Sequence, residues 1–130
     1  MVAAVKAILD TSVVLATDVP PLDGEMAISV ATLAELHFGV LVAKEMAVRA
    51  ERLRRLSIIQ RTFDALPLDE DVASSYGIIA AAVAGAGRQP RARVMDLLIA
   101  ATAHAHDARL YTRNAGDLIG IDSLVDVVTV

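Results

Sequence analysis

Four acidic residues stand where a strand or a helix is expected to begin or end. Asp10 and Asp117 follow short apolar runs, and Glu35 and Asp96 fall near the start of amphipathic segments. Two carboxylates about 5 Å apart disfavour each other by about 3 kcal/mol at an effective dielectric constant near 20. A cluster of three or four therefore requires a cation. Magnesium or manganese suits a set of oxygen ligands, because neither ion needs imidazole or thiolate.

Each acid also has a purely structural interpretation. Thr32 and Glu35 have the spacing of a capping box, and Asn114 and Asp117 resemble one with a shorter acid. The other two acids could cap a helix or complement its dipole. Gly39 favours a functional role for Glu35, since it lies one turn later on the same face and a glycine inside a helix costs about 1 kcal/mol relative to alanine.

Short apolar runs predict the strands that must position these acids. The two clearest runs, 5–9 and 110–112, look like buried strands, and a β-branched run closes the chain. Weaker candidates lie between them. The expected strands are 5–9, 27–30, 65–68, 110–112 and 125–130.

Helical periodicity separates these runs. The apolar faces are formed by Leu33, Leu36, Val40 and Leu41, by Val72, Tyr76, Ile79, Ala80 and Val83, and by Leu97, Leu98, Ala101 and Ala105. Segments 20–24 and 85–93 are predicted to be loops. Strands that alternate with helices favour a parallel sheet covered on both faces. Ligands of such sheets bind beyond the carboxyl ends of the strands, where Asp10 and the segment 112–117 are placed.

Size and composition indicate one domain, 1–130, with one core. The chain has no cysteine, no segment as long as a membrane span and no signal-peptide pattern near its start, so we expect a cytoplasmic protein. The net charge of −4 does not favour nucleic acid, but the basic residues are clustered. These clusters permit a basic patch and equally fit solvated surfaces: Lys44, Arg49, Arg52, Arg54, Arg55 and Arg61 in one, and Arg88, Arg91 and Arg93 in the other.

Other kinds of site find little support. His104 and His106 point to nearly opposite sides of a helix, and His37 falls on an apolar face, where a core or interface histidine is expected. No glycine-rich phosphate loop and no nucleophile-elbow motif occurs.

Four segments in order resemble the PIN-domain family, specifically the VapC-type toxins of toxin-antitoxin systems. They read ILDTS at 8–12, SVATLAELHFG at 29–39, DLLIAATA at 96–103 and YTRNAGD at 111–117. The resemblance implies a three-layer α/β/α sandwich with a central parallel sheet, and one or two divalent cations held by Asp10, Glu35, Asp96 and Asp117. It also implies cleavage of RNA, often transfer or ribosomal RNA, a homodimer, and inhibition by a cognate VapB-type antitoxin.

Hydroxyl and amide side chains accompany these acids. Thr112 and Asn114 are expected to contribute hydrogen bonds to the site. Thr11 and Ser12 are candidates for the same role, although turn and cap hydrogen bonds explain them equally well. The chain departs from the family pattern at Leu118, where phenylalanine is common.

Two other functions fit the same acids. A metal-dependent phosphohydrolase acting on a small phosphate ester would need a closed pocket. A non-catalytic partner-binding domain would use the acids as caps and solvated charge. An open basic groove argues against the first, and specific cation binding by the acids argues against the second.

Overall fold

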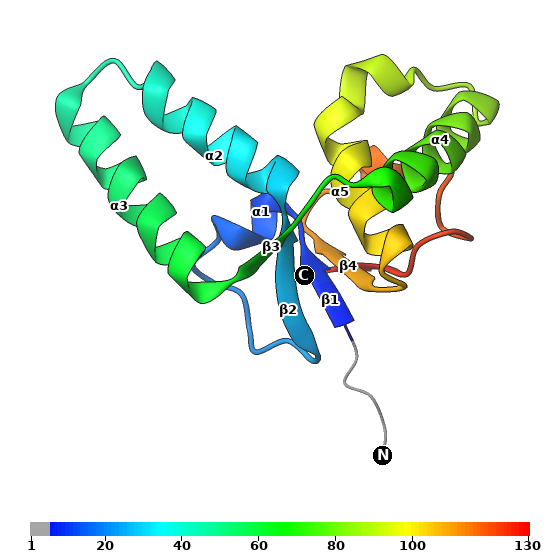
Figure 1. Cartoon of the computed structure of the whole chain (residues 1–130), viewed down its shortest axis with the longest axis horizontal. Helices are drawn as coiled ribbons and strands as arrows, with labels where there is room; N and C mark the ends of the chain where they lie inside the picture. Colours follow the sequence, from blue (N-terminus) through cyan, green and yellow to red (C-terminus); the bar gives the residue numbers. More distant parts are fainter. Residues whose placement is uncertain (1–5) are drawn as a thin grey trace.

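A computed structural model describes residues 6–130 and shows a sheet of five parallel strands in the order β3-β2-β1-β4-β5 (Figure 1). All five predicted strands are confirmed with shifted ends, although Val5, the first residue of the first one, lies outside the described residues. The strands are β1 (Lys6–Leu9), β2 (Glu25–Ser29), β3 (Asp64–Leu66), β4 (Arg109–Thr112) and β5 (Val127–Thr129).

The predicted helices also form, and none made by residues 6–130 is long and apolar enough to cross a membrane. The prediction of a loop over 85–93 is wrong for its second half. Pro90 begins a short 3₁₀ helix there, since proline is pre-organised for the first helical position. The helices are α1 (Thr11–Val14), α2 (Val30–Val42), α3 (Met46–Thr62), α4 (Glu70–Gly85), η1 (Pro90–Arg93), α5 (Val94–Ala105) and η2 (Ala115–Leu118).

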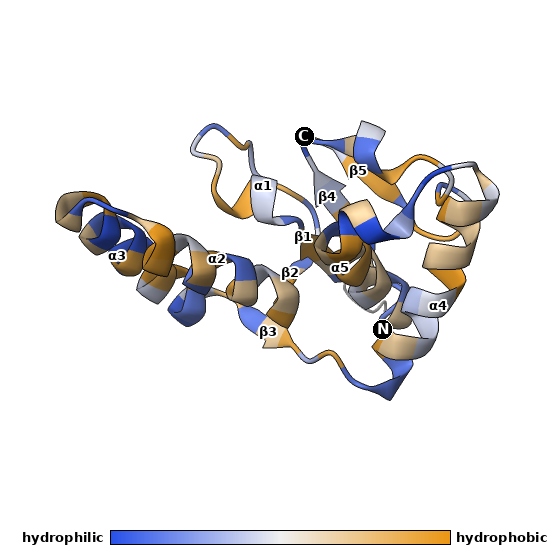
Figure 2. Ribbon diagram, turned by 90° about the horizontal axis from the view of Figure 1, so that it is seen from above, coloured by the Kyte–Doolittle hydropathy of each residue, from blue (hydrophilic) through white to orange (hydrophobic). Residues whose placement is uncertain are grey.

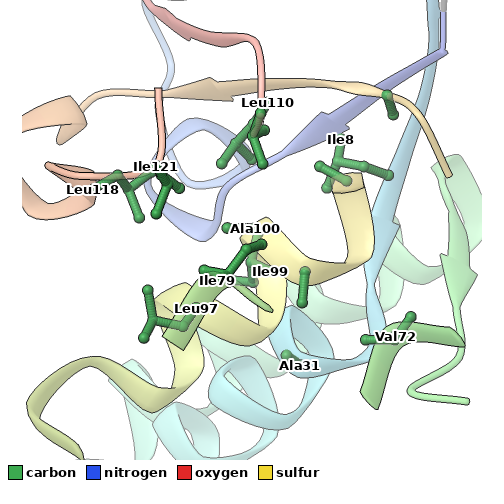
Figure 3. Packing of buried hydrophobic residues seen from close by; sticks show 14 of the residues in the cluster. Ile8, Ala31, Val72, Ile79, Leu97, Ile99, Ala100, Leu110, Leu118 and Ile121 are labelled. Atoms are coloured by element: carbon green, nitrogen blue, oxygen red, sulfur yellow. The ribbon is translucent and has the colours of Figure 1, made fainter. Parts of the chain in front are cut away.

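Alternating side chains of the central strands divide the core into two layers. Ile8 and Leu110 pack with α4 and α5 on one face of the sheet (Figure 3). Leu9 and Tyr111, one residue further along the same strands, pack on the other face with residues of α1 and α3. Successive side chains of a strand point to opposite faces, so each strand contributes to both layers. The chain is the expected three-layer α/β/α sandwich.

Helices α2 and α3 form a hairpin that projects from the sheet as an arm (Figures 1 and 2). Leu41 was expected on the buried face of α2, but it is 69% exposed on this arm. Three arginines of α3 reach neighbouring main-chain carbonyls rather than only solvent. Arg49 donates to Leu41 O at 2.9 Å, Arg52 donates to Gly39 O at 2.7 Å, and Arg55 donates to Leu15 O.

Candidate active site

The carboxyl ends of β1 and β4 lie side by side at the point where the strand order changes direction. Leu9 pairs with Tyr111, so Asp10, the residue after β1, lies beside Thr112, the last residue of β4. Asp10 N donates to Tyr111 O at 2.9 Å and continues the ladder by one bond. This is the crevice in which open α/β sheets bind ligands. The prediction that Asp10 and the segment 112–117 meet at one rim is confirmed.

Hydrogen bonds hold the buried carboxylate of Asp10 in one orientation. Its Oδ1 accepts from Thr11 N at 2.8 Å and thereby caps α1. Its Oδ2 accepts from the hydroxyls of Ser12 and Thr112, both at 2.8 Å. The two hydroxyls also tie the neighbouring segment down, because Ser12 Oγ accepts from Arg113 N at 3.2 Å and Thr112 Oγ1 accepts from Asn114 N at 3.0 Å. Asp10 is therefore both a helix cap and a fixed ligand candidate.

Glu35 reaches the same rim from the second turn of α2. Thr11 donates its hydroxyl hydrogen to Glu35 Oε1 at 2.7 Å, and its Oγ1 lies 3.0 Å from Thr32 Oγ1. The capping box predicted for Thr32 and Glu35 is wrong. Ser29 caps α2 instead, since its hydroxyl accepts from Ala31 N at 3.0 Å, and Thr32 is buried inside the first turn. The Glu35 carboxylate therefore takes no part in the helix cap and is available to the site.

Asp96 lies in the first turn of α5 and faces the other three acids. Burial raises the pKa of Asp96 above its ordinary value, and the charges of Asp10, Glu35 and Asp117 raise it further. Arg93 opposes this shift with its positive charge. Asp10, Asp96 and Asp117 line one small pocket together with Thr112 and Asn114. The four predicted acids therefore form one electrostatic cluster, in which burial and the other three charges disfavour the ionised form of Asp96.

Asp117 lies on η2 and forms an ion pair with Arg93, with 2.6 Å between Asp117 Oδ1 and Arg93 Nη1. The cap predicted for Asn114 is wrong, because its side chain makes no capping bond to η2. Leu118 is 4% exposed in the core, as expected of a packing residue.

Sequence reasoning placed Arg93 in a basic cluster but missed its place beside the acids. Its spacing of three residues before Asp96 was the available signal.

The donor set fits a magnesium or manganese ion in its chemistry. Within residues 6–130 no three histidine or acidic side chains stand close enough to share one ion in their present rotamers. Magnesium commonly uses one or two carboxylates and keeps several waters, and Asp10 and Asp96 line the same pocket. Burial and then the charges of the three neighbouring acids raise the pKa of Asp96, and a divalent cation would offset those charges.

The histidines lie away from this cluster. Of the two roles expected for His37, the core role is wrong because the residue is exposed on the arm, and the interface role stays a prediction. His104 Nδ1 lies 2.8 Å from Ser75 Oγ of α4 and holds the two helices together.

Comparison with known proteins gives the same picture. Residues 7–118 match the PIN domain family. The chain is 35% identical over 126 residues to Ribonuclease VapC5 of Mycobacterium tuberculosis, covering 92% of this chain and 90% of that protein. It is similar to the crystal structure of VapBC-5 from the same organism, a member of the VapBC family of toxin-antitoxin systems, with a TM-score of 0.80, 32% identity, and 96% and 97% of the two chains covered. FitAcB from Neisseria gonorrhoeae has a TM-score of 0.74 at 28% identity, with 93% and 95% covered. The chain belongs to the PIN domain family and, within it, to the VapC group.

Proposed function

We propose that this protein is a divalent-metal-dependent endoribonuclease that acts as the toxin of a type II toxin-antitoxin pair. The observation that carries the proposal is the cluster of four acids around Asp96, at the switch point of the sheet. Relatives named ribonuclease and structures of VapBC complexes support it.

The chain's own residues have distinct tasks in this proposal. Asp10, Glu35 and Asp96 hold magnesium or manganese directly or through its waters, and Asp117 completes the set. The bound ion supplies an activated water and stabilises charge on the phosphate oxygens. Thr112, with Ser12, fixes the Asp10 carboxylate by hydrogen bonds at 2.8 Å. These hydrogen bonds matter because removing the hydrogen-bond partner of a metal ligand typically lowers metal affinity or activity 10- to 100-fold.

Two observations weigh against the other functions. A second hollow beside Glu35 and Asp96 is bordered by the exposed residues Arg91, Ala92 and Val94, so it is open to solvent and suits a polymer better than a small ester. The raised pKa of Asp96 means that its charge opposes folding in the absence of a cation. A domain that only bound partners would gain nothing from that arrangement.

Cleavage of total RNA by the purified chain tests the proposal. Discrete cleavage is expected with magnesium or manganese and not with EDTA, and Asp10→Asn is expected to abolish it. Asp122→Asn is the matched control, because Asp122 is an exposed acid outside the pocket that Asp10, Asp96 and Asp117 line. Mapping the cleaved ends identifies the target among transfer and ribosomal RNA. A folded, cation-binding protein that leaves all RNA intact would refute the ribonuclease.

The arm offers a surface for the proposed VapB-type antitoxin. Phe38 and Met46 are 66% and 88% exposed, and an apolar hollow between α2 and α3 runs past Gly39 to Glu35. Large exposed apolar areas mark interaction sites. An inhibitor bound there would reach the acids. Co-expression with a candidate VapB-type antitoxin is expected to yield a stable complex that Phe38→Glu weakens and to suppress cleavage. The mass in solution tests the expected homodimer.

A further inference from the structure

Arg93 forms an ion pair with one acid of the cluster, Asp117. This arginine is the last residue of η1 and directly precedes α5, and its Nη1 lies 2.6 Å from Asp117 Oδ1. Among residues 6–130, Asp117 is the only one of the four acids with an ion-pair partner. The other three have hydroxyl partners, main-chain partners or none. Arg93 therefore stands apart from the residues that merely orient a carboxylate.

The charge of the cluster creates a difficulty for an RNA substrate. The four acids carry four negative charges when ionised, and one divalent cation offsets two of them. A phosphodiester brings a further negative charge. Within the described part of the chain, the positive charge of Arg93 acts on Asp96 and offsets part of the remainder. An arginine at this place lowers the repulsion that the approaching phosphate meets.

The geometry around Arg93 leaves room for that phosphate. The open hollow is lined by two acids, Glu35 and Asp96, and by two arginines, Arg91 and Arg93. A guanidinium presents five N–H donors in a planar fork that matches phosphate oxygens. The ion pair between Nη1 and Asp117 holds one end of the fork and leaves its other donors for a ligand.

The arginines on the arm are poorer candidates for this contact. Arg52 and Arg55 border the apolar hollow on the other side of Glu35. Their guanidinium groups already donate to the carbonyls of Gly39 and Leu15, and so they fasten α3 to its neighbours. Arg93 is bound instead to a half-exposed carboxylate that can hold it while it contacts a second anion.

We infer that Arg93 binds a backbone phosphate of the RNA beside the bond that is cut, and that Asp117 holds its guanidinium in position for this contact. This inference rests on the proposed ribonuclease function. It assigns the hollow between α2 and η1 to the RNA strand.

RNA binding in the absence of cleavage tests this assignment. The probe is a short fluorescein-labelled single-stranded RNA, measured by anisotropy in EDTA on a background of Asp10→Asn. Adding Arg93→Gln is expected to weaken binding about 10- to 100-fold, as the loss of one charge-assisted contact does. The slope of log K against log salt is expected to fall by about 0.7, the value for one phosphate of a single strand. Arg61→Gln is the control, since Arg61 is exposed and bonds only its own helix.

A manganese titration separates a phosphate contact from a structural role. Removing a positive charge beside Asp96 is expected to leave manganese binding as tight or tighter in Arg93→Gln, while RNA binding falls. A fall in both would mean that Arg93 supports the acids rather than the RNA, and would overturn the inference. Arg93→Lys, which keeps the charge without the fork, is expected to keep the salt slope and lose part of the affinity, and it serves if Arg93→Gln unfolds.

The outcomes also separate this inference from the proposed function. Cleavage by the unsubstituted chain, together with RNA binding that Arg93→Gln leaves unchanged, overturns the role of Arg93 alone. Failure of both the unsubstituted chain and Asp10→Asn to bind or cut RNA overturns both proposals.

Discussion

Thr112 donates its hydroxyl hydrogen to Asp10 Oδ2 at 2.8 Å, across the junction of β4 and β1. Both side chains are buried, so this bond fixes a carboxylate that water does not reach freely. Because metal ligands depend on such partners, Thr112→Val is expected to reduce manganese affinity and RNA cleavage 10- to 100-fold. Thr129→Val is the control, since Thr129 pairs with Thr112 in the sheet but is exposed. Equal effects of both changes would rule out a specific role for the bond.

Asp96 should give the metal-free protein an unusual dependence on pH. Burial and three neighbouring acids raise its pKa, so its ionised form is less favourable in the folded than in the unfolded chain. The resulting loss of stability begins as the pH rises through the unfolded pKa near 4 and is complete above the folded pKa. Asp96→Asn is therefore expected to unfold at a higher temperature than the parent at pH 7 in EDTA, and at a similar temperature below pH 4.

Thermal unfolding across that pH range checks the sign. Asp122→Asn should show no such gain, because Asp122 lies on the surface. A variant Asp96→Asn that is less stable than the parent at pH 7 in EDTA would contradict the assignment of the electrostatic cost to Asp96.

Magnesium should reverse that ranking. A ligand that binds only the folded chain stabilises it by about 2.7 kcal/mol at a concentration 100 times its Kd. The parent is expected to gain stability as magnesium is added, whereas Asp10→Asn and Asp96→Asn gain little. Calorimetry with and without EDTA measures the difference, and an equal gain in all three proteins would place the ion elsewhere.

The sequence predicted the outline of the site because local patterns encode it. Apolar runs that end in acids give strands with carboxylates at one edge, and parallel pairing brings those edges together. The position of Asp10 at the end of β1 could be predicted from that strand alone. The pairing of Leu9 with Tyr111 could not be predicted from the two strands alone, since strand order depends on contacts distant in the chain. The prediction that their acids meet therefore held only if these two strands were neighbours.

The errors lie where a local pattern competes with a long-range contact. Thr32 has the spacing of a cap, yet Ser29 takes the position because its hydroxyl also accepts a hydrogen bond from Thr102 of α5 at 3.0 Å. The pair of Arg93 and Asp117 joins η1 to η2, and the first of these was predicted as a loop. No single-segment pattern contains either contact.

Two glycines provide a last test, because the structure gives them opposite requirements. A Cβ added at Gly39 would meet nothing within 4 Å, so Gly39→Ala is expected to stabilise the chain by about 1 kcal/mol through helix propensity. Gly120 has φ of +100°, and a Cβ there would lie 3.0 Å from Ala86 Cβ, so Gly120→Ala is expected to destabilise it by about 1 to 3 kcal/mol. Urea unfolding measures both. A neutral result at Gly39 would remove the argument that this glycine is kept, at a cost in stability, for the open space beside Glu35.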